Sequence, residues 1–215
     1  MSLKVNEIFY SIQGESSYVG WPCTFIRLTG CNLRCSYCDT TYAYSEAAYL
    51  SISEIALKVS SFKCPLVEVT GGEPLIQKET TSLISELLVK GYNVLLETNG
   101  TQDISKVDPR CVRIVDIKCP SSGQAQKNDV GNLKRLTEKD EIKFVIGSKE
   151  DFEYAKGMLG LIPKPVRTRR HIHFSPVFGK MELEKLAKWI LNDHLEVRLQ
   201  VQLHKIIWSP ARRGV

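Results

Sequence analysis

The sequence predicts an α/β fold, a partial, opened β/α barrel of about six strands with few helices, formed as one domain by residues 1–215. Three observations lead to this prediction. β-prone segments alternate with amphipathic helical segments, which is typical of parallel β-α units. Polar motifs follow the carboxyl ends of the β-prone segments, and such ends meet at one face of a β/α barrel. The helical segments are too few for an eight-fold barrel.

The predicted strands are short apolar and β-branched runs that end in glycine, proline or polar residues. In chain order they cover residues 5–12, 23–29, 65–70, 93–98, 112–118, 142–146, 171–174 and 197–203. Alternation along the second strand places Phe25 and Arg27 on the face opposite Ile26. Arg27 is therefore a candidate anion-binding group, and a surface salt bridge is the alternative.

Four segments carry apolar residues at helical spacing and are predicted to form helices. They cover residues 51–61, 79–90, 151–158 and 181–191. Ser51 or Ser53 is the expected N-cap of the first helix, and Gly91 ends the second.

The composition is that of an ordinary globular protein, with 43% hydrophobic and 25% charged residues. No apolar run reaches about 18 residues, which predicts no membrane span. The first residues form no apolar signal segment, so a cytoplasmic location is expected. The net charge of +5 comes partly from two basic clusters, at 167–171 and 212–213, which are expected to be solvated surface. No nucleic-acid partner is predicted.

Three cysteines stand at C-x3-C-x2-C spacing in one short loop: Cys31, Cys35 and Cys38. Thiolates are the usual ligands of a [4Fe-4S] cluster, and three of them leave one iron open to a small molecule. A zinc site or a disulfide is the alternative, but no histidine lies near the loop to complete a zinc site. The other cysteines share no ligand spacing and are expected to be buried: Cys23, Cys64, Cys111 and Cys119.

The cysteine loop, with an aromatic residue before its third cysteine, resembles that of the radical S-adenosylmethionine (SAM) superfamily. Residues 70–74 resemble the Gly-Gly-Glu-Pro motif of the same enzymes. The resemblance implies that SAM chelates the open iron and is split into methionine and a 5′-deoxyadenosyl radical. The resemblance and the polar residues at the ends of the following predicted strands together give a set of candidate SAM-binding residues. They are Tyr37, Cys38, Asp39, Gly72, Glu73, Glu97, Asn99, Asp116 and Lys118. Asp116 and Lys118 share a strand face, so a structural ion pair is the alternative for these two.

Further segments narrow the resemblance to the 7-carboxy-7-deazaguanine synthase family. They are residues 13–15, 30–33, 38–40, 175–179, 202–208 and 212–215. The resemblance implies conversion of 6-carboxy-5,6,7,8-tetrahydropterin to 7-carboxy-7-deazaguanine with loss of ammonia, on the route to queuosine and other 7-deazapurines. It also implies Mg²⁺ as a cofactor, a homodimer, and an electron donor such as flavodoxin or ferredoxin.

The same resemblance assigns Mg²⁺ to Thr40, for which a loop-stabilising hydroxyl is the alternative. Arg27 would pair with the substrate carboxylate, and His204 is either a site residue or a satisfied buried histidine. The residues assigned to the pterin substrate are Ile12, Gln13, Gly14, Glu15, Arg27, Thr70, His204 and the C-terminal Val215. The family usually has glycine after Gln-Gly-Glu, and Ser16 at that position leaves the role of Glu15 open.

Two other functions are compatible with parts of this pattern. A glycyl-radical-enzyme activase shares the cysteine loop but acts on a large protein, and gives Gln13 and Arg27 no evident role. A non-catalytic zinc or iron–sulfur binding module needs neither SAM nor the glycine motif at Gly72 and Glu73.

Overall fold

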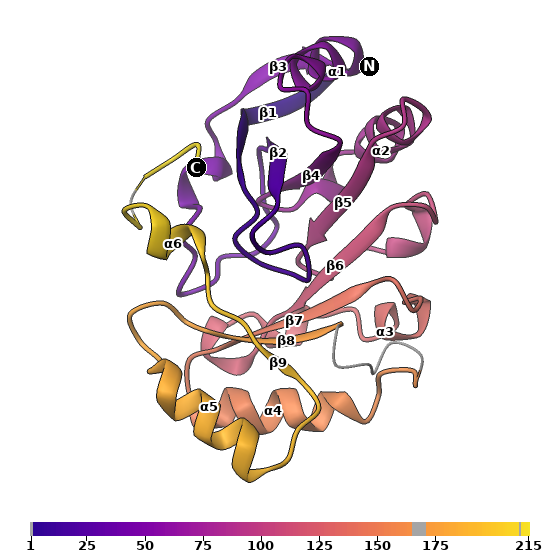
Figure 1. The fold of residues 1–215 in the computed structure, drawn as a ribbon. Helices are drawn as coiled ribbons and strands as arrows, with labels where there is room; N and C mark the ends of the chain where they lie inside the picture. Colours follow the sequence, from indigo (N-terminus) through magenta and orange to yellow (C-terminus); the bar gives the residue numbers. More distant parts are fainter. Residues whose placement is uncertain (1, 165–170, 211) are drawn as a thin grey trace.

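The computed structural model describes residues 2–164, 171–210 and 212–215, so residues 167–170 of the first basic cluster lie outside the described residues. The described chain forms one nine-stranded sheet with the order β3-β1-β2-β4-β5-β6-β7-β8-β9 (Figure 1). The strands are β1 (Ser2–Ile12), β2 (Pro22–Leu28), β3 (Ala48–Ser51), β4 (Leu66–Gly71), β5 (Asn93–Thr98), β6 (Val112–Ile117), β7 (Glu141–Ile146), β8 (Ile172–Pro176) and β9 (Arg198–Leu199).

The α-helices are α1 (Ile52–Ser61), α2 (Thr80–Val89), α3 (Asn132–Arg135), α4 (Lys149–Leu159), α5 (Leu183–Asn192) and α6 (His204–Ile207). Short 3₁₀ helices are η1 (Thr41–Tyr44), η2 (Pro74–Ile76), η3 (Ile104–Lys106), η4 (Pro120–Ser122) and η5 (Ala125–Lys127). The four predicted helices are confirmed as α1, α2, α4 and α5. Helix α1 begins with a capping box, in which the Ser51 and Glu54 side chains bond each other's backbone N–H.

The parallel part of the sheet confirms the predicted open barrel. Strands β2, β4, β5, β6, β7 and β8 run parallel, and the two edge strands β3 and β9 do not pair with each other. The prediction of a strand over 197–203 is wrong beyond its first residues, since β9 contains only two. After Gln200 the chain turns away from β8, and Leu203 N donates to Gly14 O at 2.9 Å instead.

The outer face of the sheet carries the apolar core. Helices α1 and α2 cover the β1-to-β5 half, and α4 and α5 cover the β6-to-β8 half (Figure 1). Alternate residues turn inward, as Phe25 and Arg27 do opposite the buried Ile26. The four cysteines outside the loop are buried, as predicted.

The C-terminal segment, yellow in Figure 1, runs from β9 along the inner side of the sheet to the N-terminal half of the fold. It thereby lies across the gap between the two edges of the open barrel. No helix in the described ranges has both the length and the apolar character needed to cross a bilayer.

Candidate active site

The inner side of the open barrel holds a cavity of about 720 Å³ at the carboxyl ends of the parallel strands. The structure brings to it all the residues that the sequence assigned to a site, except Glu73. They are Ile12, Gln13, Gly14, Glu15, Arg27, Cys31, Cys35, Tyr37, Cys38, Asp39, Thr40, Thr70, Gly72, Glu97, Asn99, Asp116, Lys118, His204 and Val215.

The cysteine loop is anchored from two sides. Ser36 N donates to Ser122 O at 3.1 Å, and Ser36 Oγ donates to Ser121 O at 2.7 Å. On the other side, Glu73 N donates to Gly30 O at 2.8 Å. Because the segments that follow β6 and β4 supply the two anchors, the fold fixes the path of the loop along the cavity.

Three free thiols of this loop, those of Cys31, Cys35 and Cys38, line the cavity. No three His, Cys, Asp or Glu side chains in the described parts of the chain converge as ligands of a single ion must. Separate thiols on one loop suit a cluster that takes one thiolate per iron better than they suit one tetrahedral zinc ion. Burial raises the pKa of the Cys31 and Cys35 thiols.

The glycine motif joins the cysteine loop to the next strand end. A Cβ at Gly72 would lie 2.2 Å from Gly30 O and 2.7 Å from Cys31 Cβ, so only glycine permits this approach. The Glu73 side chain is fully buried and accepts a hydrogen bond of 2.6 Å from Asn99 N. Glu73 thus ties the loop after β4 to the loop after β5 and does not face the cavity.

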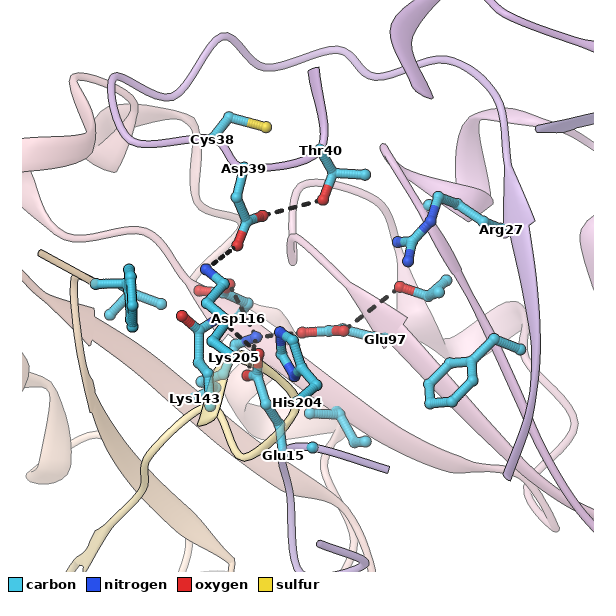
Figure 2. A pocket seen from close by; sticks show the side chains of 18 of the residues that line it. Glu15, Arg27, Cys38, Asp39, Thr40, Glu97, Asp116, Lys143, His204 and Lys205 are labelled. Carbon is cyan, nitrogen blue, oxygen red and sulfur yellow. Dashed lines mark hydrogen bonds and ion pairs between the residues drawn. The ribbon is translucent and has the colours of Figure 1, made fainter. Parts of the chain in front are cut away.

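A buried ammonium lies among three carboxylates on the inner face (Figure 2). Lys143 Nζ lies 2.9 Å from Glu15 Oε2 and 3.6 Å from Asp116 Oδ2, and it also contacts Glu97. Lys118 Nζ pairs with Asp116 Oδ2 at 2.8 Å, the ion pair that the sequence left as an alternative. Burial raises the pKa of Glu15, but Lys143 and the other polar neighbours more than offset this and lower it to about 2. The Glu15 carboxylate is therefore held ionised at neutral pH.

Arg27 points into the cavity from β2, across from this cluster (Figure 2). Its Nε donates to Glu7 Oε1 at 2.7 Å, and its side chain is only 16% exposed. The pair is therefore partly buried in the cavity wall and is not the fully exposed surface salt bridge of the alternative interpretation. In the described residues the two terminal guanidinium nitrogens have no carboxylate partner, so they can bind an anion.

Gln13 is 4% exposed, and most of its polar groups bond to the protein. Its Nε2 donates to the Glu68 carboxylate, and its Oε1 accepts from Glu15 N at 3.0 Å. Its backbone N–H and C=O bond to Trp21 and Gly20, each at 2.8 Å. Gln13 therefore braces the loop that carries Glu15.

The backbone of Gly14 touches the C-terminal segment. A Cβ at Gly14 would lie 2.1 Å from His204 Nδ1, so glycine lets the imidazole lie against the loop. Burial lowers the pKa of His204, which favours the neutral ring at pH 7.

Asp39 links the cysteine loop to α6. Lys205 Nζ lies 2.5 Å from Asp39 Oδ2, and Thr40 Oγ1 donates to Asp39 Oδ1 at 3.0 Å (Figure 2). Burial raises the pKa of Asp39, but Lys205 and Thr40 lower it to about 2. The Thr40 hydroxyl stabilises its loop here, and its oxygen lone pairs can still bind a cation.

Comparison with known proteins identifies the family. The radical SAM superfamily pattern matches residues 25–113. A 7-carboxy-7-deazaguanine synthase from Chlorobaculum tepidum is 48% identical and aligns over 99% of this chain and 97% of its own. One from Koribacter versatilis is 41% identical over 99% of this chain and 100% of its own. The chain belongs to the 7-carboxy-7-deazaguanine synthase family.

Solved structures agree with this family at the level of the fold. QueE from Escherichia coli superposes with a TM-score of 0.78 over 95% of both chains, at 24% identity. SuiB from Streptococcus suis, solved with bound SAM, gives a TM-score of 0.53 over 80% of this chain and 44% of its own, at 13% identity. These likenesses show a shared partial barrel.

Membership of the radical SAM superfamily implies a [4Fe-4S] cluster and SAM, and the residues of this 7-carboxy-7-deazaguanine synthase family member fit both. Three thiols lie on one loop at the cavity. Asp116 Oδ1 and Tyr37 Oη are buried and have no hydrogen-bond partner among the described residues. Buried polar atoms of this kind beside a cavity are complementary to a polar ligand.

Sequence reasoning missed further residues that line the cavity, among them Glu68, Lys143, His173 and Gln200. Two of them carried a signal. Glu68 lies two residues before Thr70 and so shares its inward face, and Lys143 interrupts an apolar strand with a charge. The other two depend on how β8 and β9 pair, which their local sequence does not reveal.

The buried Glu68 side chain should make the free energy of unfolding decrease as pH rises. Burial, and next the charge of Glu97, raise the pKa of Glu68 well above 4.5. The folded protein then keeps a proton that the unfolded chain releases, so this contribution is complete below pH 4.5 and is lost as pH rises toward the folded pKa. Glu68→Gln should match the wild type near pH 4.5 and exceed its stability at pH 8, by about 1.4 kcal/mol per pH unit between the two pKa values. Urea unfolding at both pH values measures this difference, and parallel pH dependences would contradict it.

Proposed function

We propose that this protein converts 6-carboxy-5,6,7,8-tetrahydropterin to 7-carboxy-7-deazaguanine with loss of ammonia, using SAM and a [4Fe-4S] cluster in the strand-end cavity. The observation that carries the proposal is the 48% identity, over nearly the whole of both chains, to a relative of that name. The cluster and SAM supply a 5′-deoxyadenosyl radical when bound. The protein's own residues bind the two molecules, orient them and enclose them.

The cluster side of the cavity is assigned to SAM. Cys31, Cys35 and Cys38 would supply the three thiolates. The residues proposed to contact SAM are Tyr37, Cys38, Asp39, Gly72, Glu97, Asn99, Asp116 and Lys118. The Asp116 and Glu97 carboxylates suit the ammonium and hydroxyl donors of SAM. Glu73 would act indirectly, because its carboxylate holds the backbone of Asn99.

The opposite side is assigned to the pterin. The free end of the Arg27 guanidinium would bind the substrate carboxylate, and the Val215 carboxylate would accept from the donor-rich aminopyrimidine. Thr70 Oγ1 donates to Glu97 Oε2 at 3.4 Å, and this contact supports a position for Thr70 between the two ligands. The remaining substrate residues of this proposal are Ile12, Gln13, Gly14, Glu15 and His204, with Gln13 acting mainly by bracing Glu15.

Mg²⁺ is assigned to the Thr40 hydroxyl and the substrate carboxylate, because Mg²⁺ prefers oxygen ligands and keeps several waters. We further propose one domain over residues 1–215, a homodimer, a cytoplasmic location, and flavodoxin or ferredoxin as the electron donor. The C-terminal segment contributes Lys205 and Val215 to the cavity wall. A cavity that has the C-terminal segment as part of its wall favours a small molecule over the protein substrate of a glycyl-radical-enzyme activase.

Anaerobic incubation of the reconstituted protein with the carboxytetrahydropterin, SAM, Mg²⁺ and reductant tests the function. We expect 7-carboxy-7-deazaguanine and ammonia in equal amounts. If SAM is cleaved and no product forms, the substrate is wrong although the radical chemistry stands. If the purified protein holds zinc and takes up no iron, the whole proposal fails.

Arg27→Ala should raise the KM for the pterin by about 30-fold, because removing one partner of a charge pair that the bound substrate shields from water costs about 2 kcal/mol. Iron content should equal that of the wild type. Arg110→Ala is the matched control, since among the described residues Arg110 forms its ion pair with Asp108 at the surface. Loss of iron from Arg27→Ala would refute the substrate role.

A further inference from the structure

The cavity wall formed by β8 and the segment after β9 carries polar atoms that no role above uses. His173 is 1% exposed and Gln200 is 6% exposed, and both line the cavity. Within the described chain, His173 Nδ1 and both amide atoms of Gln200 are buried without a hydrogen-bond partner. Unpaired buried polar groups cost free energy, so three of them at one wall of a ligand cavity call for a ligand that pairs with them.

The His173 ring is held in place by a hydrogen bond at the nitrogen opposite Nδ1. Its Nε2 lies 2.7 Å from Glu141 Oε2, which also accepts from Ser17 N at 2.9 Å. A carboxylate only accepts hydrogen bonds, so Nε2 donates to Glu141, and in the neutral ring this leaves Nδ1 as an acceptor.

The Gln200 backbone is held on both sides. Gln200 N donates to Phe174 O at 3.0 Å, and Ser175 Oγ donates to Gln200 O at 3.0 Å. Two residues on, the amide of Gln202 behaves differently, because its Nε2 donates to Glu15 Oε1 at 2.8 Å. The protein thus satisfies one of these two neighbouring amides and leaves the other unpaired at the cavity.

We propose that His173 and Gln200 form a subsite for the edge of a nitrogen heterocycle that presents an N–H donor beside a ring-nitrogen acceptor. A primary amide forms two hydrogen bonds with such an edge, as glutamine does with adenine. His173 Nδ1 accepts a further N–H of the same molecule. The inference rests on the proposed function, which supplies two such edges: the adenine of SAM and the aminopyrimidinone ring of the pterin.

Gln200→Met tests the subsite, because methionine keeps the length of the side chain and removes both hydrogen-bonding atoms. In the reconstituted protein without reductant, equilibrium dialysis measures SAM alone, and then the pterin with SAM saturating. We expect about a tenfold rise in the Kd of one ligand and less than a twofold change in the other. A rise confined to SAM assigns adenine, and a rise confined to the pterin assigns its aminopyrimidinone ring. If the Kd values of both ligands rise equally, or if neither Kd rises, the proposal is overturned.

Two further variants separate the subsite from a general effect on the fold. His173→Gln keeps a donor toward Glu141 but removes Nδ1, and should weaken the same ligand as Gln200→Met. Thr24→Val is the control, since Thr24 Oγ1 is also buried and unpaired but Thr24 does not line the cavity. It should change neither Kd, and a loss equal to that of Gln200→Met overturns the proposal.

The thermal midpoint of the ligand-free protein adds a readout independent of turnover. Because Gln200→Met removes an unpaired buried amide, the Tm of this variant should equal or exceed that of the wild type. A lower Tm together with weaker binding of both ligands would overturn the proposed subsite. If the wild type cleaves SAM but forms no deazaguanine, the proposed function has failed on its own, and the SAM arm still decides the subsite.

Discussion

Cys35→Ala should reduce SAM cleavage to background and remove most of the iron. A cluster that takes one thiolate per iron would keep only Cys31 and Cys38 as protein ligands. Losing a group that merely orients a metal ligand costs about 10–100-fold in metal affinity or activity, so losing a ligand should cost more than about a hundredfold. Iron and sulfide per chain, with deoxyadenosine formed after reduction, measure the effect.

Cys111→Ala is the matched control for this variant. Cys111 is fully buried in the core on the outer face and does not line the cavity. It should keep the iron and the activity of the wild type, with a loss of stability of about 1 kcal/mol. Full iron in Cys35→Ala, or iron loss in Cys111→Ala, would show that the loop cysteines are not the ligands.

The sequence predicted well those helices and strands whose caps or alternation patterns lie within their own residues. Helix α1 begins at the expected Ser51 cap, and the alternation of β2 turns Arg27 inward. The edge strands were predicted poorly because they depend on their partners. β3 pairs with β1, and β9 contains only two residues because the chain then leaves β8, so that Leu203 N donates to Gly14 O.

The residues of the site likewise fall into those that local motifs predict and those that depend on long-range contacts. The cysteine loop and Gly72 are local motifs, and the sequence predicted their place at the cavity. The groups that set its electrostatics are joined across long sequence distances, as Lys143 is to Glu15 and Gln13 is to Glu68. No periodicity reports such pairs, and they appear only when the sheet order brings the strands together.

The buried charge cluster gives the largest expected effect on stability. Lys143 is 8% exposed and is the cation that Glu15, Glu97 and Asp116 share. Lys143→Met keeps most of the side-chain volume and leaves these carboxylates less compensated. Removing one partner of a buried ion pair typically costs about 3–5 kcal/mol, so we expect a loss of about 3 kcal/mol at pH 7. Binding in the cavity should weaken as well, since Glu15 and Glu97 would no longer be held in place.

The pH dependence separates lost charge from lost packing in Lys143→Met. The pKa of Glu15 is about 2 in the folded wild type and 4.5 in its ordinary state, so this carboxylate stabilises the fold above pH 4.5 and ceases to do so as pH falls toward 2. The variant has already lost that contribution, and the stability difference should therefore shrink in acid. Urea unfolding at pH 7 and at pH 3.5 measures it. Lys188→Met, which removes an exposed partner of Glu184 on α5, should cost about 0.5 kcal/mol or less at both pH values. A Lys143→Met loss as small as this control, or one independent of pH, would mean that the ammonium does not hold the carboxylates of the site.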